Sequence, residues 1–168
     1  MASGLPDILA ADLSVVFCGL NPGAEAAATG HHFVGRSNRF WRVIHLAGFT
    51  PTQIDPMNDT SLLSFGCGLT TVAERPTASA DEITKDEFLA GGLALRQKIE
   101  RYTPRYVAFL GKAAFAAIAE KREVSWGRQP AAIGGAAIWI LPNPSGRNRS
   151  FGLAALVDAY SQLRRELD

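Results

Sequence analysis

The stretch SVVFCGLNPG, Ser14 to Gly23, decides the fold. Residues 14–20 form a mainly apolar run with β-branched side chains, which predicts a strand buried on both faces. Asn21 and a proline follow directly, and a residue before a proline avoids helical backbone angles. A buried strand that ends in a polar turn is typical of a parallel sheet covered by helices.

The same arrangement returns later in the chain, where AAIWILP (136–142) leads into Asn143 and a second proline. Another buried strand is expected for RYVAFLGK (105–112), and CGLTTVA (67–73) is a weaker candidate, either strand or loop. Parallel strands present their carboxyl ends at one edge of the sheet, where such folds bind ligands. We therefore expect Asn143 and Asn21 to lie at one site.

Helical patterns alternate with these strands. The expected helices are 37–48, opened by Ser37; 84–102, opened by a capping box of Thr84 and Glu87; 113–121; and 152–167. The pair Gly91-Gly92 costs about 1 kcal/mol per glycine in a helix, which predicts close packing against a neighbour. The alternation predicts an α/β protein, a single three-layer α/β/α domain over residues 1–168 with a mostly parallel central sheet.

Composition limits the classes of function. The chain has 168 residues, 47% hydrophobic and 20% charged, with a net charge of +1, as in an ordinary globular protein. A polyanion must therefore be held by a local basic patch. No apolar run reaches the ~20 residues of a spanning helix, so we expect a cytoplasmic protein without membrane contact.

The cysteines and tryptophans are predicted to be structural. Cys18 and Cys67 lie in apolar stretches without CxxC spacing, which argues against a zinc knuckle or a four-cysteine cluster and favours a reducing compartment. Trp41, Trp126 and Trp139 stand in helical or apolar contexts and are expected in the core.

Two loops could carry chemistry. GLNPGAEAAATGHHF (19–33) lacks both the Gly-Lys-Ser/Thr of a P-loop and GxGxxG, and Ala113 follows Lys112 where a magnesium-binding hydroxyl would stand, so nucleotide hydrolysis is disfavoured. From composition alone, Asn21 fits a turn residue equally well. The run SGRNR (145–149) is either a solvated basic turn or a nucleic-acid contact.

The motifs VVFCGLNPG, GHHF, SNRFWRVIHLAGF, ERPT, GGLALRQKIERYTP, FLGK and ILPNPSGRNR together resemble the mismatch-specific uracil-DNA glycosylases and their thymine-DNA glycosylase relatives, of the uracil-DNA glycosylase superfamily. The resemblance runs from about Val15 to the final helix. It implies a monofunctional base-excision repair enzyme that flips mispaired uracil out of duplex DNA and hydrolyses the N-glycosidic bond, leaving an abasic site.

The same resemblance implies partners and site residues. The expected partner is double-stranded DNA with mispaired or deaminated pyrimidines, bound by a monomer with no metal or other cofactor, at the nucleoid if the source is bacterial. Asn21 orients the attacking water, and Phe33 stacks on the extruded base. Further base contacts are Gly19, Leu20, Gly23, Ala26 and Asn143. The wedge that enters the duplex is Arg147, and the other DNA contacts are Ser145, Gly146, Asn148, Arg149 and Lys112.

Several positions depart from uracil-preferring relatives. Those proteins often carry serine at Ala26, lysine at Thr71 and leucine at Arg147, so this chain is expected to process G·U and C5-substituted uracils well and G·T weakly. Asp81 and Glu82, in the loop before the capped helix, are the nearest candidates for an auxiliary acid. Two alternatives remain open: a DNA-lesion binding protein with little turnover, and a glycosylase for another deaminated base such as hypoxanthine.

Overall fold

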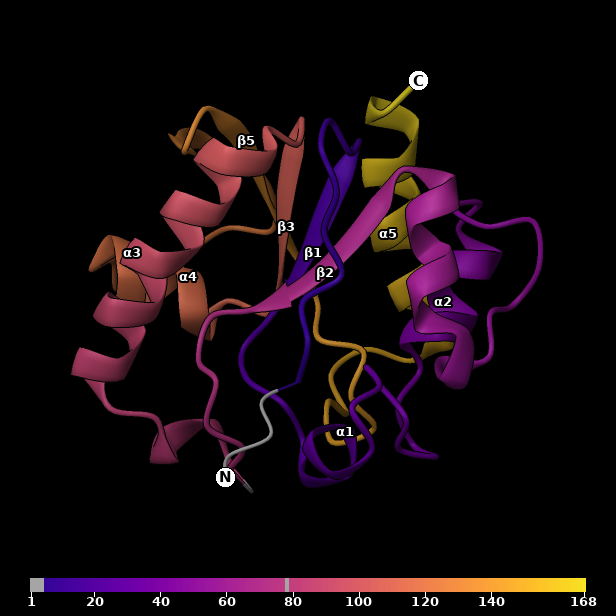
Figure 1. Cartoon of the computed structure of the whole chain (residues 1–168), viewed down its shortest axis with the longest axis horizontal. Helices are drawn as coiled ribbons and strands as arrows, with labels where there is room; N and C mark the ends of the chain where they lie inside the picture. The colour runs from indigo at the N-terminus through magenta and orange to yellow at the C-terminus, as the bar shows by residue number, and fades with distance from the viewer. Residues whose placement is uncertain (1–4, 78) are drawn as a thin grey trace.

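The computed structural model describes residues 5–77 and 79–168, and Figure 1 shows a central sheet between two layers of helices. The five strands lie in the order β2-β1-β3-β5-β4. Their bounds are β1 Val15–Gly19, β2 Cys67–Thr71, β3 Tyr106–Leu110, β4 Gly127–Ile133 and β5 Ala136–Leu141. All neighbouring pairs are parallel except β4 and β5. The predicted α/β class with a mostly parallel sheet is confirmed.

The helices cover both faces of the sheet. They are α1 Ala24–Thr29, α2 Phe40–Leu46, η1 Pro56–Phe65, η2 Ala80–Glu82, α3 Lys85–Tyr102, α4 Ala113–Ala119 and α5 Leu153–Glu166. Side chains alternate along β1, so Val15 and Phe17 join the core with α2 and α5, whereas Cys18 joins the core with α3 and α4. Both faces of β1 are buried, as its continuous apolar run predicts.

Helix α3 confirms two sequence predictions. Thr84 and Glu87 form the expected capping box, with each side chain bonded to the other residue's backbone N–H. The glycine pair allows close packing on both sides of the helix. A Cβ at Gly91 would lie 2.2 Å from the carbonyl oxygen of Val72, and one at Gly92 would lie 3.1 Å from Ile118 of α4.

The edge strand β4 was not expected. Its sequence GRQPAAI contains Pro130, which removes a backbone donor and argues against a strand, except at an edge. The structure places it at that edge, antiparallel to β5, with an irregular register between Arg128 and Ala132. The prediction that Trp126 is a core residue is wrong, because its side chain is 45% exposed just before this strand.

Helix α2 starts later than predicted. The expected opening at Ser37 is replaced by a start at Phe40, whose backbone N–H donates to Oδ1 of Asn38 at 2.9 Å. Residues 37–39 therefore stay in the loop that precedes α2. Trp41 is buried beneath this loop, as predicted, and Trp139 is buried in β5.

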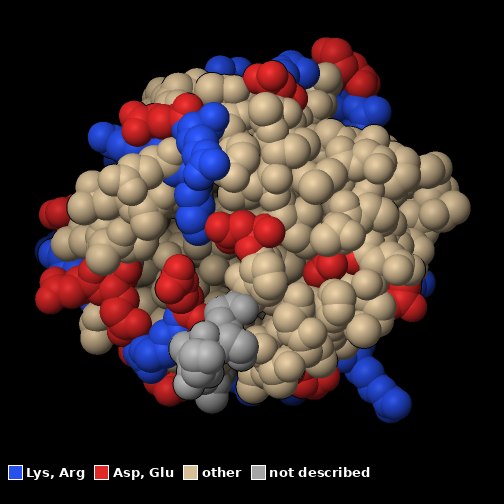
Figure 2. Space-filling view, in the orientation of Figure 1, with Lys and Arg blue, Asp and Glu red and all other residues tan. Residues whose placement is uncertain are grey.

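The segments that carry the two Asn-Pro turns come together at the carboxyl edge of the sheet. In Figure 1, α1, the loop between β5 and α5, and the segment between β2 and η2 all lie along the lower edge of the molecule. Figure 2 shows charged side chains of both signs over the α3 side of the viewed face and few over the side of α2. None of the helices in residues 5–77 and 79–168 is long and apolar enough to cross a membrane.

Candidate active site

A pocket of about 380 Å³ opens at the carboxyl edge of the sheet. It joins the turn after β1, the loop before α2, the segment after β2 and the loop after β5. The described residues that line it are Gly19, Leu20, Asn21, Phe33, Asn38, Thr77, Ser79, Ala80, Leu110, Asn143, Ser145, Arg147 and Asn148. The two Asn-Pro turns that the sequence placed on one rim thus lie at one pocket.

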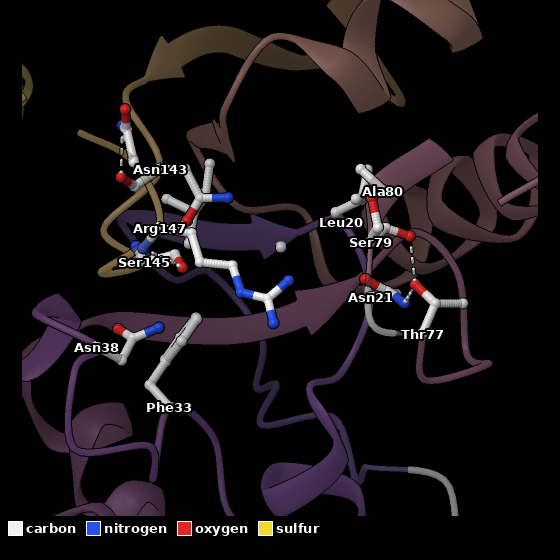
Figure 3. A pocket seen from close by; sticks show the side chains of 13 residues that line it. Leu20, Asn21, Phe33, Asn38, Thr77, Ser79, Ala80, Asn143, Ser145 and Arg147 are labelled. Atoms are coloured by element: carbon white, nitrogen blue, oxygen red, sulfur yellow. Dashed lines mark hydrogen bonds between the residues drawn. The ribbon is translucent and has the colours of Figure 1, made fainter. Parts of the chain in front are cut away.

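The amide of Asn21 has a fixed orientation. Its Nδ2 donates to the carbonyl oxygen of Arg75 at 2.8 Å and to Oγ1 of Thr77 at 2.9 Å. A backbone carbonyl can only accept, so the nitrogen must face Arg75. The hydroxyl of Thr77 donates in turn to the carbonyl oxygen of Ser79 at 2.8 Å. The Oδ1 atom of Asn21 consequently faces the pocket as an acceptor, as Figure 3 shows.

The segment that holds Asn21 is tied to the start of α3. The guanidinium of Arg75 contacts both carboxylate oxygens of Glu87, at 3.0 and 2.8 Å, and donates to the carbonyl oxygen of Glu82 at 2.7 Å. The hydrogen bonds from Arg75, followed by those from Thr84, lower the pKa of Glu87 to about 2, so this carboxylate stays ionised at neutral pH. The ion pair fixes the backbone from which the Arg75 carbonyl reaches Asn21.

Phe33 forms the opposite wall of the pocket (Figure 3). Its backbone φ is +55°, which is uncommon for a bulky residue and needs support from its surroundings. The buried carboxylate of Asp59 supplies that support, because Oδ2 accepts from the backbone N–H of His32 at 3.0 Å and Oδ1 lies 3.3 Å from Nδ1 of His31. The Phe33 ring stacks on Phe40 with centroids 4.2 Å apart.

The second Asn-Pro turn is closed by its own side chains. Oδ1 of Asn143 accepts from the backbone N–H of Ser145 at 2.9 Å, and the Asn143 carbonyl accepts from Nδ2 of Asn148 at 2.9 Å. The backbone N–H of Arg147 donates to Oγ of Ser145 at 3.2 Å. The loop that carries Arg147 therefore has a defined shape at the mouth of the pocket.

Arg39 anchors this loop from beneath. Its guanidinium donates to four backbone carbonyls of the loop: Pro144 at 3.3 Å, Ser145 at 2.8 Å, Asn148 at 3.1 Å and Phe151 at 2.7 Å. A planar fork of five donors suits such a set better than an ammonium does. The loop also packs tightly on the segment before α2, since a Cβ at Gly146 would lie 2.6 Å from Cβ of Ser37.

Eight of the residues that sequence assigned to the site line the pocket: Gly19, Leu20, Asn21, Phe33, Asn143, Ser145, Arg147 and Asn148. The others lie around it. Gly23 caps α1 and Ala26 is buried within α1, while Gly146 and Arg149 are exposed in the loop after β5. The Lys112 ammonium sits 4.4 Å above the ring of Trp126. The roles assigned to both groups remain predictions.

Asp81 lies at the rim rather than inside. Its carboxylate accepts a hydrogen bond from Oγ of Ser79, which lowers the pKa of Asp81 and keeps it ionised. Ser79 lines the pocket, whereas Asp81 is exposed to solvent in η2. An ionised carboxylate has no proton to donate, so the geometry does not support the assignment of Asp81 as an auxiliary acid.

Sequence reasoning gave no role to Asn38, Thr77, Ser79, Ala80 or Leu110, which also line the pocket. Asn38 stands in the SNRFW motif and Thr77 in the ERPT motif, so both belong to motifs that carry the family resemblance. Figure 3 shows the Asn38 amide beside Phe33, with its nitrogen on the pocket side. Long-range hydrogen bonds such as the one between Asn21 and Thr77 leave no periodic pattern that could have revealed them.

The arrangement can orient a water molecule and bind a planar ring. An acceptor oxygen from Asn21, an aromatic wall from Phe33 and a donor from Asn38 converge, and the described lining contains no carboxylate. The described residues contain no group of three or more His, Cys, Asp or Glu side chains that could hold a metal ion. Burial raises the pKa of both cysteines, that of Cys67 to about 12, so neither thiol is a ready nucleophile.

Comparison with known proteins identifies the fold and the family. A solution NMR structure from Methanosarcina acetivorans, described provisionally as a uracil DNA glycosylase, has the same fold, with a TM-score of 0.63 and 21% sequence identity over 98% of this chain and 99% of that chain. The sequence pattern of the family described as "Uracil DNA glycosylase superfamily" matches residues 6–164. Because that match spans nearly the whole sequence, the chain belongs to the uracil DNA glycosylase superfamily.

Proposed function

We propose that this protein is a monofunctional DNA glycosylase that removes uracil from mispairs in duplex DNA. The observation that carries the proposal is the fixed amide of Asn21, whose acceptor oxygen faces a pocket walled by Phe33. Membership of the superfamily supports the reaction class. Such a protein would act as a monomer in the compartment that holds the cell's DNA.

In the proposed reaction, the target nucleotide leaves the duplex and its base stacks on Phe33. A duplex hides the glycosidic bond, and extrusion costs a few kcal/mol, least for a mispaired base. The oxygen of Asn21 accepts a hydrogen bond from the attacking water and aims the water oxygen at the anomeric carbon. An amide cannot take up that proton as a carboxylate could, so we expect a slow enzyme that depends on a good leaving group.

The loop of residues 145–149 is proposed to occupy the gap that the extruded nucleotide leaves. Its backbone is held by Arg39 and by the Asn143 turn, so insertion needs little further ordering of the loop. Arg149 and Lys112 are proposed to contact phosphates. Inserting a side chain offsets part of the lost base stacking.

The first experiment measures base release with enzyme in excess over a G·U duplex. Wild-type protein should form abasic product, and Asn21→Ala should release base ~10²-fold more slowly with nearly unchanged duplex affinity, because Asn21 holds water rather than DNA. Asn58→Ala, an exposed asparagine of η1, is the matched control and should be unaffected. Binding of the lesion without product would favour the alternative of a lesion-binding protein, which is worth testing because the described lining of the pocket contains no carboxylate.

The proposal also covers which damaged bases the protein releases and at what relative rates. The wild type should process G·U fastest, G·T weakly, and electron-poor C5-substituted uracils well, whereas a duplex with hypoxanthine should be a poor substrate. Ala26 is proposed to leave room for a C5 substituent. One methyl-sized group in a pocket changes the discrimination between two substrates by about 1–3 kcal/mol. Ala26→Ser should therefore lower G·T activity relative to G·U. An unchanged ratio would remove Ala26 from the specificity determinants.

A further inference from the structure

Arg147 is directed into the pocket rather than away from the protein. Figure 3 shows its side chain extending from the loop after β5, with the guanidinium over the space between Phe33 and Asn21. Phe33 and Asn21 are the proposed stacking wall and water-orienting residue. A side chain that only filled a gap in the duplex would be expected to point outward from this loop.

The pocket needs a positive charge for the proposed chemistry. When the C1′–N1 bond breaks, its electron pair passes to the base, and negative charge spreads over the pyrimidine N1 and its carbonyl oxygens. Water adds to C1′, its proton is lost to solvent, and the released base is later protonated from solvent. Asn21 can orient the water but cannot neutralise the leaving anion, and Arg147 carries the one formal charge among the described residues that line the pocket.

Hydrogen bonds fix the backbone of Arg147 at the mouth of the pocket, where its guanidinium would contact the base. Its backbone N–H donates to Oγ of Ser145 at 3.2 Å, and the neighbouring carbonyls of Ser145 and Asn148 accept from the guanidinium of Arg39 at 2.8 and 3.1 Å. The head group is exposed at the mouth of the pocket, so it can meet a base that enters from solvent. A backbone that is already fixed limits what must be ordered when substrate binds.

We infer that Arg147 is a catalytic residue that donates hydrogen bonds to the carbonyl oxygens of the extruded pyrimidine and stabilises the departing base anion. The inference rests on the proposed glycosylase function and deepens it. It differs from the wedge role implied by the family resemblance, because a wedge matters only in a duplex. Stabilisation of the leaving group acts equally on single-stranded substrate.

Single-turnover base release from single-stranded oligonucleotides tests this role. Uracil and 5-fluorouracil are close in size, but 5-fluorouracil is the more acidic leaving group and needs less help. Arg147→Gln should slow uracil release ~10²-fold and 5-fluorouracil release only ~10-fold, as expected when one donor to a developing anion is lost. Arg147→Lys should recover part of the uracil rate. Equal losses for the two bases, or a loss confined to duplex substrate, would overturn the inference.

A binding measurement keeps the inference separate from the proposed function. Barbiturate is a pyrimidine anion at neutral pH and probes the pocket without turnover. Wild type should bind barbiturate more tightly than neutral uracil, and Arg147→Gln should lose ~10-fold of barbiturate affinity. Arg96→Gln, which removes an exposed arginine from α3, should lose none. If the wild type forms no abasic product, the proposed function fails, and equal barbiturate affinity of wild type and Arg147→Gln would still refute the contact.

Discussion

The Nδ2 atom of Asn21 lies 2.8 Å from the carbonyl oxygen of Arg75, which is 54 residues away in the sequence. A second partner, Oγ1 of Thr77, lies 2.9 Å from the same nitrogen. Together they prevent the amide from rotating, so its oxygen stays in the pocket. We therefore expect the rate of base release to depend on residues that never contact the substrate's sugar.

Thr77→Val should slow single-turnover base release ~10-fold, because an isosteric side chain that cannot accept leaves Nδ2 of Asn21 with one partner and permits rotation. Duplex affinity should change little, since the effect falls on water orientation. Thr77→Ser keeps the hydroxyl and should retain most of the rate. Equal rates for the valine and serine variants would show that Arg75 alone orients the amide.

Arg39→Lys should weaken activity on duplex substrate by about 10-fold or more, because one ammonium cannot replace a guanidinium that holds four carbonyls of the loop after β5. Amide hydrogen exchange should accelerate over residues 145–151. Arg42→Lys, at an exposed position of α2, is the control and should leave exchange in that loop unchanged. Wild-type protection in Arg39→Lys would mean that Asn143 and Gly146 suffice to shape the loop.

The order of elements and the place of the site could be predicted from the sequence because both follow from local patterns. The apolar run before Asn21 is long enough and uniform enough to require burial on both faces, and the α3 capping box is encoded within four residues. Parallel strands then place Asn21 and Asn143 at one edge. Such features depend on residues that are close together in the sequence, so one sequence is enough to predict them.

The remaining features depend on contacts between distant segments. β4 forms because β5 offers an edge to pair with, although Pro130 weakens its own strand pattern. Thr77 enters the site through a hydrogen bond to Asn21 across 56 residues. Trp126 is exposed because it precedes an edge strand, where an apolar residue need not be buried. Composition and periodicity carry no information about such pairings.

Stability should fall as the pH drops below neutrality, because of His32. Burial lowers the pKa of this imidazole from 6.5, and the residue is 2% exposed, with Nε2 donating to the Pro6 carbonyl at 2.7 Å. Below pH 6.5 the unfolded chain takes up a proton that the folded chain resists, so the unfolded state is favoured. The loss is at most about 1.4 kcal/mol per pH unit for one proton.

Urea unfolding at pH 7, 6 and 5 should show this slope in wild type and a shallower one in His32→Gln, whose amide can still donate to Pro6. The full contribution should be present above pH 6.5 and decrease toward the lowered pKa of the folded state. The same slope in both proteins would assign the pH dependence to other groups.

Duplex binding should weaken steeply with salt, although the net charge is only +1. The logarithm of the binding constant falls with the logarithm of salt concentration by about 0.9 for each phosphate contact. Arg149→Gln should reduce the magnitude of that slope by about 1 if this exposed arginine meets a phosphate. Arg96→Gln on α3 should leave the slope unchanged. An unaltered slope in Arg149→Gln would place Arg149 outside the DNA contact.

Gly91→Ala should destabilise the fold even though alanine is the better helix former. The helix propensity gained is about 1 kcal/mol. Against it, the new Cβ would lie 2.2 Å from the carbonyl oxygen and 2.9 Å from Cγ1 of Val72, and the clash with backbone cannot be relieved by a side-chain rotation. Overpacking of this kind costs about 1–3 kcal/mol, and the required shift of α3 away from β2 places the result at the upper end of that range.

Gly35→Ala, where nothing lies within 4 Å of the added Cβ, is the control and should unfold near the wild-type urea concentration. Because Val72 precedes the segment that holds Asn21, Gly91→Ala should also slow base release, and wild-type stability together with a wild-type rate would show that α3 can move without disturbing the pocket.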